Sequence, residues 1–309
     1  PDIVVAITIA AVVLGTNLAY YSSREGTMSH LYSFFLFTVF ILLTVNWHKR
    51  RGIGLLMALG ALAGIITLVR PTNILILLFF FLYDVSSWKT FLQKIKFIFS
   101  HFHWFILMFL AFVIIWIPQM IYWEKITGQL FYYSYSEEPF YFNNPQILNG
   151  LFSFRKGWLL YTPLMVFALL GIPLLFVKMK SFSWAVLIFI TVNIYVVFSW
   201  WCWWYGGGFG QRAMIDSYPV LSIPLALLIN RLGKRGKLIS RGVVFVLFTL
   251  ILHNIFQLEQ YKYNTIHYDS MTKEAYKKVF LKLHPPEGHW DLLKSPDYEK
   301  AVKGIREYP

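Results

Sequence analysis

The sequence predicts an all-α protein that crosses a membrane about nine times and carries a small polar appendage at its C-terminal end. Three observations lead to this fold class. Of the 309 residues, 57% are hydrophobic and only 14% are charged, which is far too apolar for an ordinary soluble domain. Apolar runs bounded by polar clusters recur along the chain, at lengths suited to about 30 Å of hydrocarbon. Basic residues alternate between successive loops, as in multi-pass membrane proteins.

The expected membrane spans are the apolar runs themselves. In chain order they cover 3–20, 31–46, 52–69, 72–83, 104–121, 158–177, 184–201, 216–229 and 242–258. The fourth is short and follows Arg70-Pro71. Because proline disfavours helical backbone at the preceding residue, we expect a broken or re-entrant span that lines a cavity. The run 84–103 interleaves aromatic and aliphatic residues with lysines, which predicts an amphipathic helix on the cytoplasmic leaflet.

The distribution of lysine and arginine sets the expected orientation. One set of alternate loops contains thirteen: Lys49, Arg50, Arg51, Lys89, Lys94, Lys96, Lys178, Lys180, Arg231, Lys234, Arg235, Lys237 and Arg241. The opposite set, before the tail, contains six: Arg24, Arg70, Lys125, Arg155, Lys156 and Arg212. The positive-inside rule makes the first set cytoplasmic, which places the N-terminal end of this chain in the cytoplasm and the tail outside. The net charge of +13 is then a topology signal, and nucleic acid is not an expected partner.

We expect two regions along the chain. Residues 1–258 form a transmembrane helical bundle, and residues 259–309 form the polar appendage on the outer side. In the appendage, Thr272 can cap one short helix, and a second starts near Ser295-Pro296-Asp297. The appendage has too few apolar side chains for a core of its own, so it should pack on the outer loops. Because the chain starts with Pro1 at the edge of a span, it is expected to be the C-terminal part of a longer protein.

Four basic residues lie near helix ends on the expected outer side, where charge at membrane depth is costly. They are Arg70, Arg155, Lys156 and Arg212. Guanidinium groups near an interface suit bidentate recognition of phosphate, so these four predict a site for one anionic headgroup. The alternative for each is that it reaches out to the interface or to lipid headgroups without a specific ligand.

The segment WWCWWYGGGFGQR (200–212) sets four tryptophans and a tyrosine against three consecutive glycines. Glycines permit positive φ angles and close approach, and aromatic faces pack against sugar rings and lipids, which predicts a ligand-lining turn. The expected lining residues are Trp204, Tyr205, Gly207, Gly208, Gln211 and, from the short outer loop 21–30, His30. An ordinary interface loop is the alternative. Cys202 is the only cysteine, so it forms no intramolecular disulfide, and a small apolar filler is its expected role.

Carboxylates on the outer side are the candidates for a general base. They are Glu137 and Glu138 in the long loop 122–157, Glu25 in the loop 21–30, and Asp216 after the glycines. Adjacent exposed carboxylates are more often simply solvated. His101 and His103 are spaced i, i+2 and have no carboxylate beside them, so the sequence supports no metal site, although a divalent metal is not excluded. No cofactor is expected.

Four stretches in order resemble one family. They are GTNLAYYSSREGTMSHLYSFFL (15–36), ALAGIITLVRPTN (61–73), FSFRKGWLLYTPLMVFALLGI (152–172) and WWYGGGFGQRAMIDSYPVLSIPLALLI (203–229). This series resembles the GT-C class of integral-membrane glycosyltransferases, in the bacterial branch related to protein O-mannosyltransferases and the aminoarabinose transferase of lipid A. The resemblance implies a polyprenyl-phosphate sugar donor, a protein, lipid or glycan acceptor, and a location in the bacterial inner membrane with a periplasmic tail.

The same resemblance implies roles for particular residues. By position in these motifs, Arg70, Arg155, Lys156 and Arg212 are donor-phosphate contacts. In the family, the key acidic residue lies in the first large outer loop, which falls upstream of Pro1. None of the four candidate carboxylates matches that acidic motif, so the catalytic base stays open.

Two other functions remain as alternatives. One is a non-catalytic membrane subunit of a larger envelope assembly, which docks through its aromatic outer loops and tail. The other is a transporter of a lipid-linked sugar, which should show related halves and charged residues near the midplane of the membrane.

Overall fold

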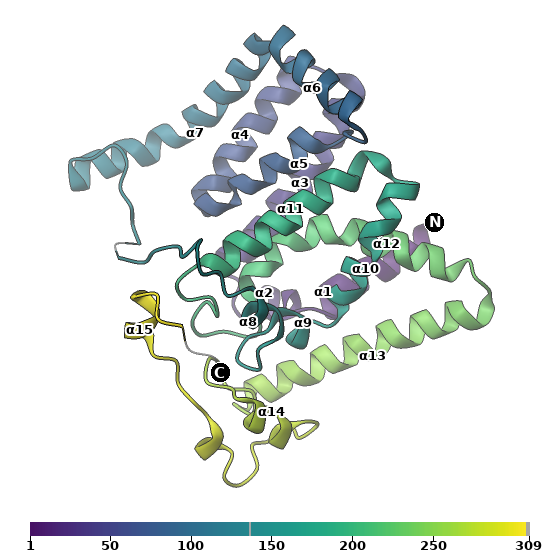
Figure 1. Ribbon diagram of the computed structural model, residues 1–309, viewed down its shortest axis with the longest axis vertical. Coiled ribbons are helices and arrows are strands. Elements are labelled where there is room, and N and C mark those ends of the chain that lie inside the picture. The colour runs from purple at the N-terminus through teal and green to yellow at the C-terminus, as the bar shows by residue number, and fades with distance from the viewer. Residues whose placement is uncertain (136, 307–309) are drawn as a thin grey trace. The chain divides into compact units, whose positions relative to one another are not determined.

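The computed structural model describes residues 1–135 and 137–306, and this part of the chain is helical with no β-strand (Figure 1). The α-helices are α1 (Asp2–Leu14), α2 (Leu18–Ser23), α3 (Ser29–Arg50), α4 (Ile53–Val69), α5 (Ile76–Leu82), α6 (Trp88–Ser100), α7 (Phe102–Thr127), α8 (Ile147–Phe152), α9 (Trp158–Tyr161), α10 (Leu164–Lys178), α11 (Lys180–Ser199), α12 (Tyr218–Gly233), α13 (Lys237–Lys262), α14 (Lys273–Val279) and α15 (Tyr298–Val302). Three short 3-10 helices are η1 (Pro71–Leu75), η2 (Arg212–Ser217) and η3 (Trp290–Leu292).

Within the described residues, five helical segments are long and apolar enough to cross a membrane. They are α3, α7, α11, η2 with α12, and α13. Four shorter apolar segments, α1, α4, η1 with α5, and α10, fall in the remaining predicted spans. The all-α class is confirmed for the described residues, the five long apolar segments support a membrane protein, and the figure of nine spans stays a prediction.

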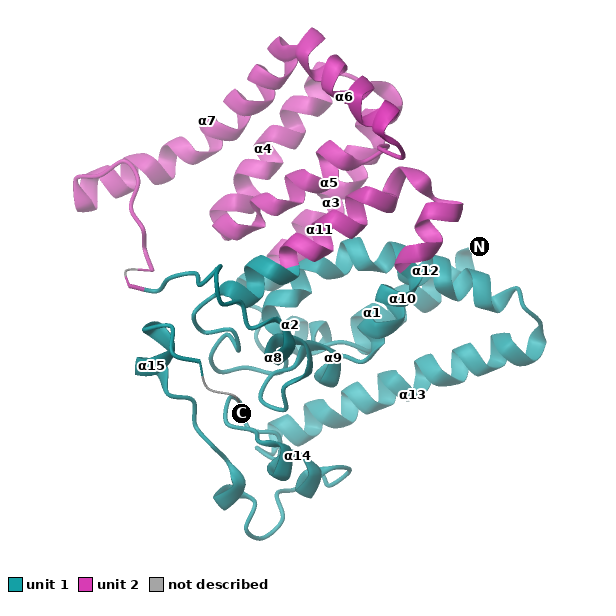
Figure 2. Ribbon diagram, viewed as in Figure 1, with its two compact units in different colours: residues 1–31, 138–171, 194–309 teal, residues 32–137, 172–193 magenta. Residues whose placement is uncertain are grey.

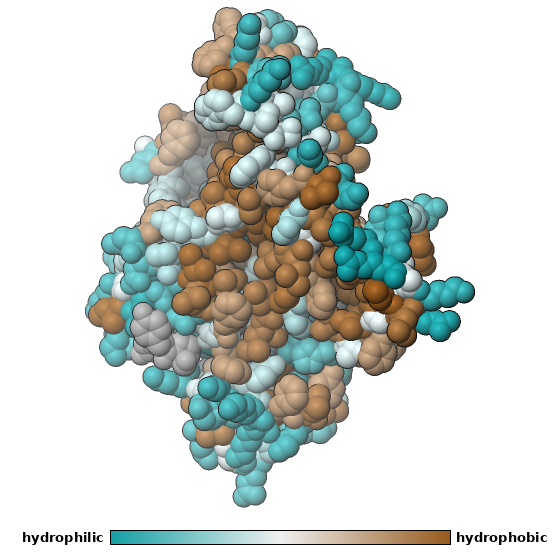
Figure 3. All heavy atoms as spheres, turned by 45° about the vertical axis from the view of Figure 1, so that its right-hand side comes forward, coloured by the Kyte–Doolittle hydropathy of each residue, from teal (hydrophilic) through white to brown (hydrophobic). Residues whose placement is uncertain are grey.

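Apolar side chains face outward on the long helices. Examples are Phe109 and Ile114 on α7, and Phe245 and Phe248 on α13. Brown, apolar atoms accordingly cover much of the face shown in Figure 3. Such surfaces suit contact with lipid, because hydrocarbon and not water is the solvent around a membrane span.

Two of the predicted apolar runs are interrupted where the sequence carries glycine or proline. The first run divides into α1 and α2 around Gly15, and the sixth divides into α9 and α10 at Pro163. Between the third and fourth runs, Arg70 is extended (φ −154°, ψ 118°) and Pro71 starts a 3-10 helix that leads into α5, as expected for a residue before proline, and a re-entrant span stays a prediction. The non-helical backbone at each break needs other hydrogen-bond partners, and side chains supply some of them.

Clustering of contacts divides the chain into two compact units (Figure 2). Unit 1 contains residues 1–31, 138–171 and 194–309, and unit 2 contains residues 32–137 and 172–193. Each unit is described by itself.

In unit 1, α1, α12 and α13 pack against one another. The side-chain amide of Asn254 on α13 donates two hydrogen bonds of 2.8 Å, to the main-chain oxygens of Leu14 and Thr16 at the end of α1. These oxygens lie where the helical hydrogen-bond pattern stops, so the amide satisfies acceptors that lipid cannot. Asn254 therefore stabilises the break between α1 and α2.

In unit 2, α4 and α7 make the most extensive contact between two elements of the chain. A Cβ atom at Gly60 would lie 2.1 Å from the main-chain oxygen of Met108, and one at Gly64 would lie 2.9 Å from Ile115 Cβ. Trp116 Nε1 donates to Thr67 Oγ1 at 2.9 Å across the same contact. Glycines four residues apart on an apolar helix allow this close approach of two backbones.

Helix α6 confirms the helix predicted within 84–103. It starts with a capping box in which Ser87 and Thr90 each bond the other's backbone N–H. An apolar stripe on its outward face continues into α7 and consists of Trp88, Leu92, Ile95, Phe99 and Phe102, all exposed. The leaflet on which α6 lies stays a prediction.

The tail packs on neighbouring loops, as the sequence predicts. Met271, Ala275 and Val279 form one core cluster with Tyr161 of α9 and Phe209 of the glycine-rich segment. Thr272 caps α14 by accepting from the Ala275 N–H, whereas Asp297, and not Ser295, caps α15. The predicted boundary at 258/259 falls within α13, which continues to Lys262, and the tail belongs to unit 1.

Candidate functional site: cations around a glycine-rich turn

The glycine-rich segment after α11 is a turn with an unusual backbone. Tyr205, Gly206, Gly208 and Gly210 all have positive φ angles, between 58° and 136°. At Gly208 a Cβ atom would lie 2.6 Å from the Tyr21 hydroxyl, so both the torsion and the space require glycine. The turn thus brings bare backbone carbonyls close to neighbouring side chains.

Two cations bind successive carbonyls of this turn. The Lys156 ammonium donates to the main-chain oxygen of Gly208, and Arg212 Nη1 donates to that of Gly207 at 3.1 Å. Lys156 is only 2% exposed. The tight turn at residues 153–157, between α8 and α9, directs it inward.

Neither of these two cations forms an ion pair with a carboxylate among the described residues. Burial, followed by the nearby charge of Arg212, lowers the pKa of Lys156 to about 7. Arg212 Nε is buried and has no hydrogen-bond partner. The turn therefore holds two cations without a direct ion pair, and the Asp269 and Glu25 carboxylates offset the charge of Lys156 only in part.

Arg155 lies beside the same segment and reaches the tail. Its guanidinium carbon is 5.6 Å from the centre of the Trp204 ring, within the range of a cation–π contact. Its Nη1 donates to the main-chain oxygen of Asp269 at 3.1 Å. Like Lys156, Arg155 is 2% exposed.

The Asp269 carboxylate is part of a hydrogen-bonded network in the tail. It accepts from the Ser270 hydroxyl at 2.6 Å and from the Tyr298 hydroxyl at 3.0 Å, and it pairs with His267 at 3.3 Å. Burial alone would raise the pKa of this carboxyl, but the hydrogen bonds from His267, Ser270 and Tyr298 outweigh burial and lower it. Trp204 Nε1 in turn contacts the Tyr298 hydroxyl at 3.4 Å, which ties the network to the glycine-rich turn.

The candidate carboxylates lie in different settings. Asp216 is buried and pairs with His30 at 3.1 Å, so two residues predicted for different roles form one dyad. Glu25 Oε1 accepts from the Tyr20 hydroxyl at 2.7 Å, and its Oε2 is buried and has no partner. Glu138 accepts from Trp201 Nε1 at 3.0 Å, whereas Glu137 is exposed.

The other predicted lining residues support the turn itself. Gln211 is fully buried, and its side chain donates to the Trp203 main-chain oxygen at 2.9 Å, while its Oε1 has no partner. The Tyr205 hydroxyl donates to Val197 O at 3.0 Å. Burial raises the pKa of the Cys202 thiol to about 12, which agrees with a small buried filler and not with a reactive thiol.

Three of the four predicted phosphate-binding cations, Arg155, Lys156 and Arg212, thus surround one turn. The fourth, Arg70, belongs to unit 2, where it follows α4. Unit 2 also contains an apolar groove of about 600 Å³ along α7 and the segment that follows it. Trp116 lines this groove and bonds Thr67, three residues before Arg70 on the chain.

Sequence reasoning missed the residues of the tail that complete the site. Asp269, Tyr298 and His267 reach the turn only through the fold, since Arg155 and Asp269 are 114 positions apart. Their one signal in the sequence is a group of polar side chains, HYDS (267–270), in a segment that otherwise reads as a loop.

Comparison of the chain with models of protein families, with curated proteins and with solved structures finds no match. Within residues 1–135 and 137–306, no three His, Cys, Asp or Glu side chains are grouped closely enough to hold a metal ion.

Proposed function

We propose that this chain is the membrane part of a glycosyltransferase of the GT-C type. It transfers a sugar from a polyprenyl-phosphate donor to a protein, lipid or glycan acceptor at the outer face of the bacterial inner membrane. In this proposal the chain crosses the membrane nine times, the basic loops are cytoplasmic, and the tail is periplasmic.

One observation carries the proposal: Lys156 is buried beside Arg212, and neither forms an ion pair with a carboxylate among the described residues. A buried ammonium without a direct ion pair is unfavourable, and an anion placed between the two cations would relieve that cost. A donor phosphate provides such an anion. As the bond to the sugar breaks, negative charge grows on the leaving phosphate, so cations held in advance lower the barrier.

Unit 2 has an apolar groove along α7, lined by aromatic side chains that include Phe112, Trp116 and Trp123. Because α7 is a candidate membrane span, such a surface suits contact with lipid tails. Arg70 also belongs to unit 2, so its role as a donor contact stays a prediction from the sequence.

Two groups are candidates to accept a proton from the acceptor hydroxyl. The His30–Asp216 dyad has the arrangement in which a carboxylate orients an imidazole. Glu25 is the second, because one oxygen is fixed by Tyr20 and the other has no hydrogen-bond partner. The dyad is buried, so an acceptor reaches it only if the surrounding segments move apart. Glu25 is less buried and needs a smaller movement.

Sugar transfer by the reconstituted full-length protein tests the proposal. With a defined polyprenyl-phosphate sugar, we expect Arg212→Ala and Lys156→Met to lower turnover by about a hundredfold, as loss of a preorganised transition-state contact does. Arg24→Ala is the matched control, because Arg24 is an exposed cation of the same unit and should leave turnover unchanged. Unchanged turnover in correctly folded Arg212→Ala and Lys156→Met would remove the role assigned to these cations.

A non-catalytic membrane subunit is the second candidate. It is favoured by the burial of Arg155 and Lys156, whose side chains donate to main-chain oxygens and so already fix the tail and the turn. For this function the full-length protein should transfer no sugar and should co-purify with other envelope proteins. Disruption of the turn should then release those proteins.

A further inference from the structure

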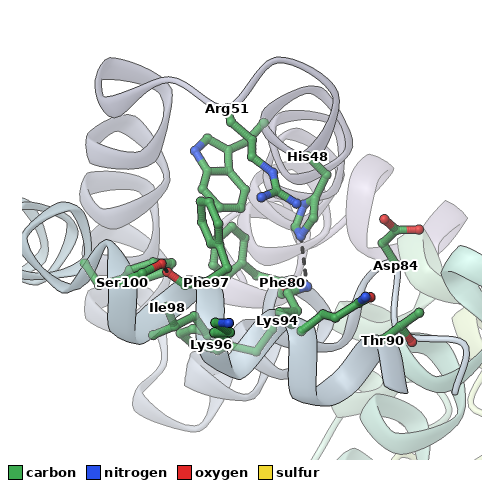
Figure 4. Close-up of a pocket in the computed structure, with 14 residues that line it drawn as sticks. His48, Arg51, Phe80, Asp84, Thr90, Lys94, Lys96, Phe97, Ile98 and Ser100 are labelled. Atoms are coloured by element: carbon green, nitrogen blue, oxygen red, sulfur yellow. Dashed lines mark hydrogen bonds between the residues drawn. The ribbon is translucent and has the colours of Figure 1, made fainter. Parts of the chain in front are cut away.

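Unit 2 contains a further cavity, and its lining residues are far from the glycine-rich turn in the sequence. It has a volume of about 380 Å³ and is bordered by the end of α3, the end of α5, α6 and the start of α7 (Figure 4). Its walls combine aromatic rings, such as Phe80, Phe97 and Phe105, with charged side chains. The sequence alone predicts only an amphipathic helix in this region.

The charges around this cavity are mainly positive. Arg51, Lys94 and Lys96 line it, together with a single acid, Asp84, whose Oδ1 accepts from Ser181. The guanidinium of Arg51 lies 4.1 Å from the centre of the Phe97 ring, and Figure 4 shows it beside His48. Arg51 has a φ angle of 31°, in the left-handed region that favours glycine, so its backbone is strained.

Lys94 is held in place by the elements around it. Its ammonium donates to the main-chain oxygens of Phe80 and Tyr83 at the end of α5, and to His48 Nε2 at 2.9 Å. These contacts give Lys94 a structural role as a cap of α5. Its charge still faces the cavity, but its hydrogen bonds are used, so a ligand would be bound through Arg51 and Lys96.

One polar group in the wall has no partner. Trp47 lines the cavity and is 1% exposed, and its indole Nε1 is buried without a hydrogen bond. Because this nitrogen has no accessible surface, a ligand in the cavity would not reach it. Arg51 and Lys96 are exposed, and two such cations beside one acid favour an anionic ligand.

Helix α6 forms one wall of the cavity and also carries the exposed stripe described above. Trp88 and Phe99, at its two ends, are 72% and 74% exposed. Aromatic side chains on the outer face of an amphipathic helix, with lysines beside them, are typical of insertion into the surface of an anionic leaflet. The cavity wall would therefore lie at the depth of lipid headgroups.

We propose that this cavity binds the phosphate group of an anionic phospholipid from the leaflet into which α6 inserts. Arg51 and Lys96 contact the phosphate oxygens, and the buried Lys94 fixes the end of α5 behind them. The aromatic rings pack against the glycerol end of the lipid. None of these residues takes part in the proposed sugar transfer.

Native mass spectrometry of the full chain from nanodiscs tests the proposal, with equal amounts of phosphatidylglycerol and phosphatidylcholine. We expect tightly held phosphatidylglycerol to be enriched on the wild-type chain. Arg51→Gln and Lys96→Gln should each reduce that enrichment by about tenfold, the effect of losing a hydrogen bond to a charged group. Both side chains are exposed, so neither substitution opens a gap in the core.

Lys89→Gln is the matched control, because Lys89 lies on α6 and is exposed but does not line the cavity. It should leave the enrichment unchanged. Equal losses in Lys89→Gln and Arg51→Gln would overturn the proposal and indicate general attraction by surface charge. Displacement of the lipid by millimolar inorganic phosphate or glycerol phosphate would overturn the lipid assignment and identify a free phosphate as the ligand. Wild-type enrichment in folded Arg51→Gln and Lys96→Gln variants would also contradict the proposal.

Discussion

At the scale of single residues, the most informative feature is the burial of Lys156 next to Arg212. A lysine that costs stability when charged is retained in a protein only if another requirement outweighs that cost. The carbonyl of Gly208 accounts for one of its three N–H donors. An arriving anion is the simplest source of further compensation.

The lowered pKa of Lys156 predicts how stability depends on pH. In the folded chain the pKa of Lys156 is about 7, below the 10.5 of a solvated lysine, so between these values the unfolded chain binds more protons. Stability should therefore rise as the pH rises from about 7 towards 10, because the protonated lysine that favours the unfolded chain is progressively lost. Thermal unfolding in detergent should show this rise for the wild type. In Lys156→Met the rise should be smaller by a few kcal/mol.

The difference between the two proteins isolates Lys156 from other groups that titrate in this range. If the curves of wild type and Lys156→Met run parallel from pH 7 to 10, then Lys156 stays protonated in the folded chain. An acid or a bound anion would then have to lie beside it.

Part of the candidate site could be predicted from residue types alone. Arg155, Lys156 and Arg212 were chosen because cations at a membrane boundary need partners, and all three surround the turn at 203–212. Their detailed partners could not be predicted. The Asp216 carboxylate pairs with His30 across 186 positions, and only the packing of distant segments decides such a contact.

At the scale of elements, glycine placement controls how closely helices approach. Gly60 and Gly64 face α7, whereas Gly54, on the same helix α4, has open space where a Cβ would be. The spacing of four residues between Gly60 and Gly64 was available in the sequence. Which of the neighbouring helices it faces was not, because an apolar helix shows little amphipathic pattern.

This contrast predicts opposite effects of one substitution on α4. Gly60→Ala places a methyl group against the main chain of Met108, so we expect a loss of about 1–3 kcal/mol as the helices separate. Gly54→Ala meets no neighbour and should be neutral or raise stability by up to about 1 kcal/mol through helix propensity. Thermal unfolding of the two variants measures the difference. A Gly60→Ala variant as stable as Gly54→Ala would show that α4 and α7 do not pack in this way.

Helix breaks were only partly predictable. Helix α4 ends before Arg70-Pro71 as the sequence predicts, yet Pro118, Pro173 and Pro224 lie inside continuous helices. A proline ends a helix only if the freed carbonyl finds another partner and the kink fits its neighbours. Those conditions depend on tertiary contacts, so sequence alone does not separate the two cases.

At the scale of the whole molecule, composition and charge predicted the class of protein. The apolar runs became helices, and their ends mostly agree with the predicted spans within a few residues. The sequence predicts that the tail lies on the loops, because about fifty mostly polar residues cannot bury enough apolar surface by themselves. The structure agrees, since the core cluster of the tail includes Tyr161 and Phe209. The number of spans cannot follow from length alone, since α1 and α10 have 13 and 15 residues.

The proposed orientation predicts which segments are accessible from outside the cell. In a background with Cys202→Ser, single cysteines at Lys234 and at Lys273 report on the loop after α12 and on the tail. A maleimide that does not cross membranes should label Lys273→Cys in intact cells, and Lys234→Cys only after permeabilisation. Both residues are exposed in the structure, so burial does not explain a difference. The reverse labelling pattern would invert the topology.

The hydrogen bond from Arg155 to the backbone of residue 269 has a kinetic consequence. The Arg155 guanidinium is buried, so a ligand cannot contact it until the tail moves away, and binding there takes two steps. In the first step, the hydrogen bond to the main-chain oxygen of Asp269 breaks. The frequency of that release would then set an upper bound on how fast Arg155 is engaged, whatever the concentration of the ligand.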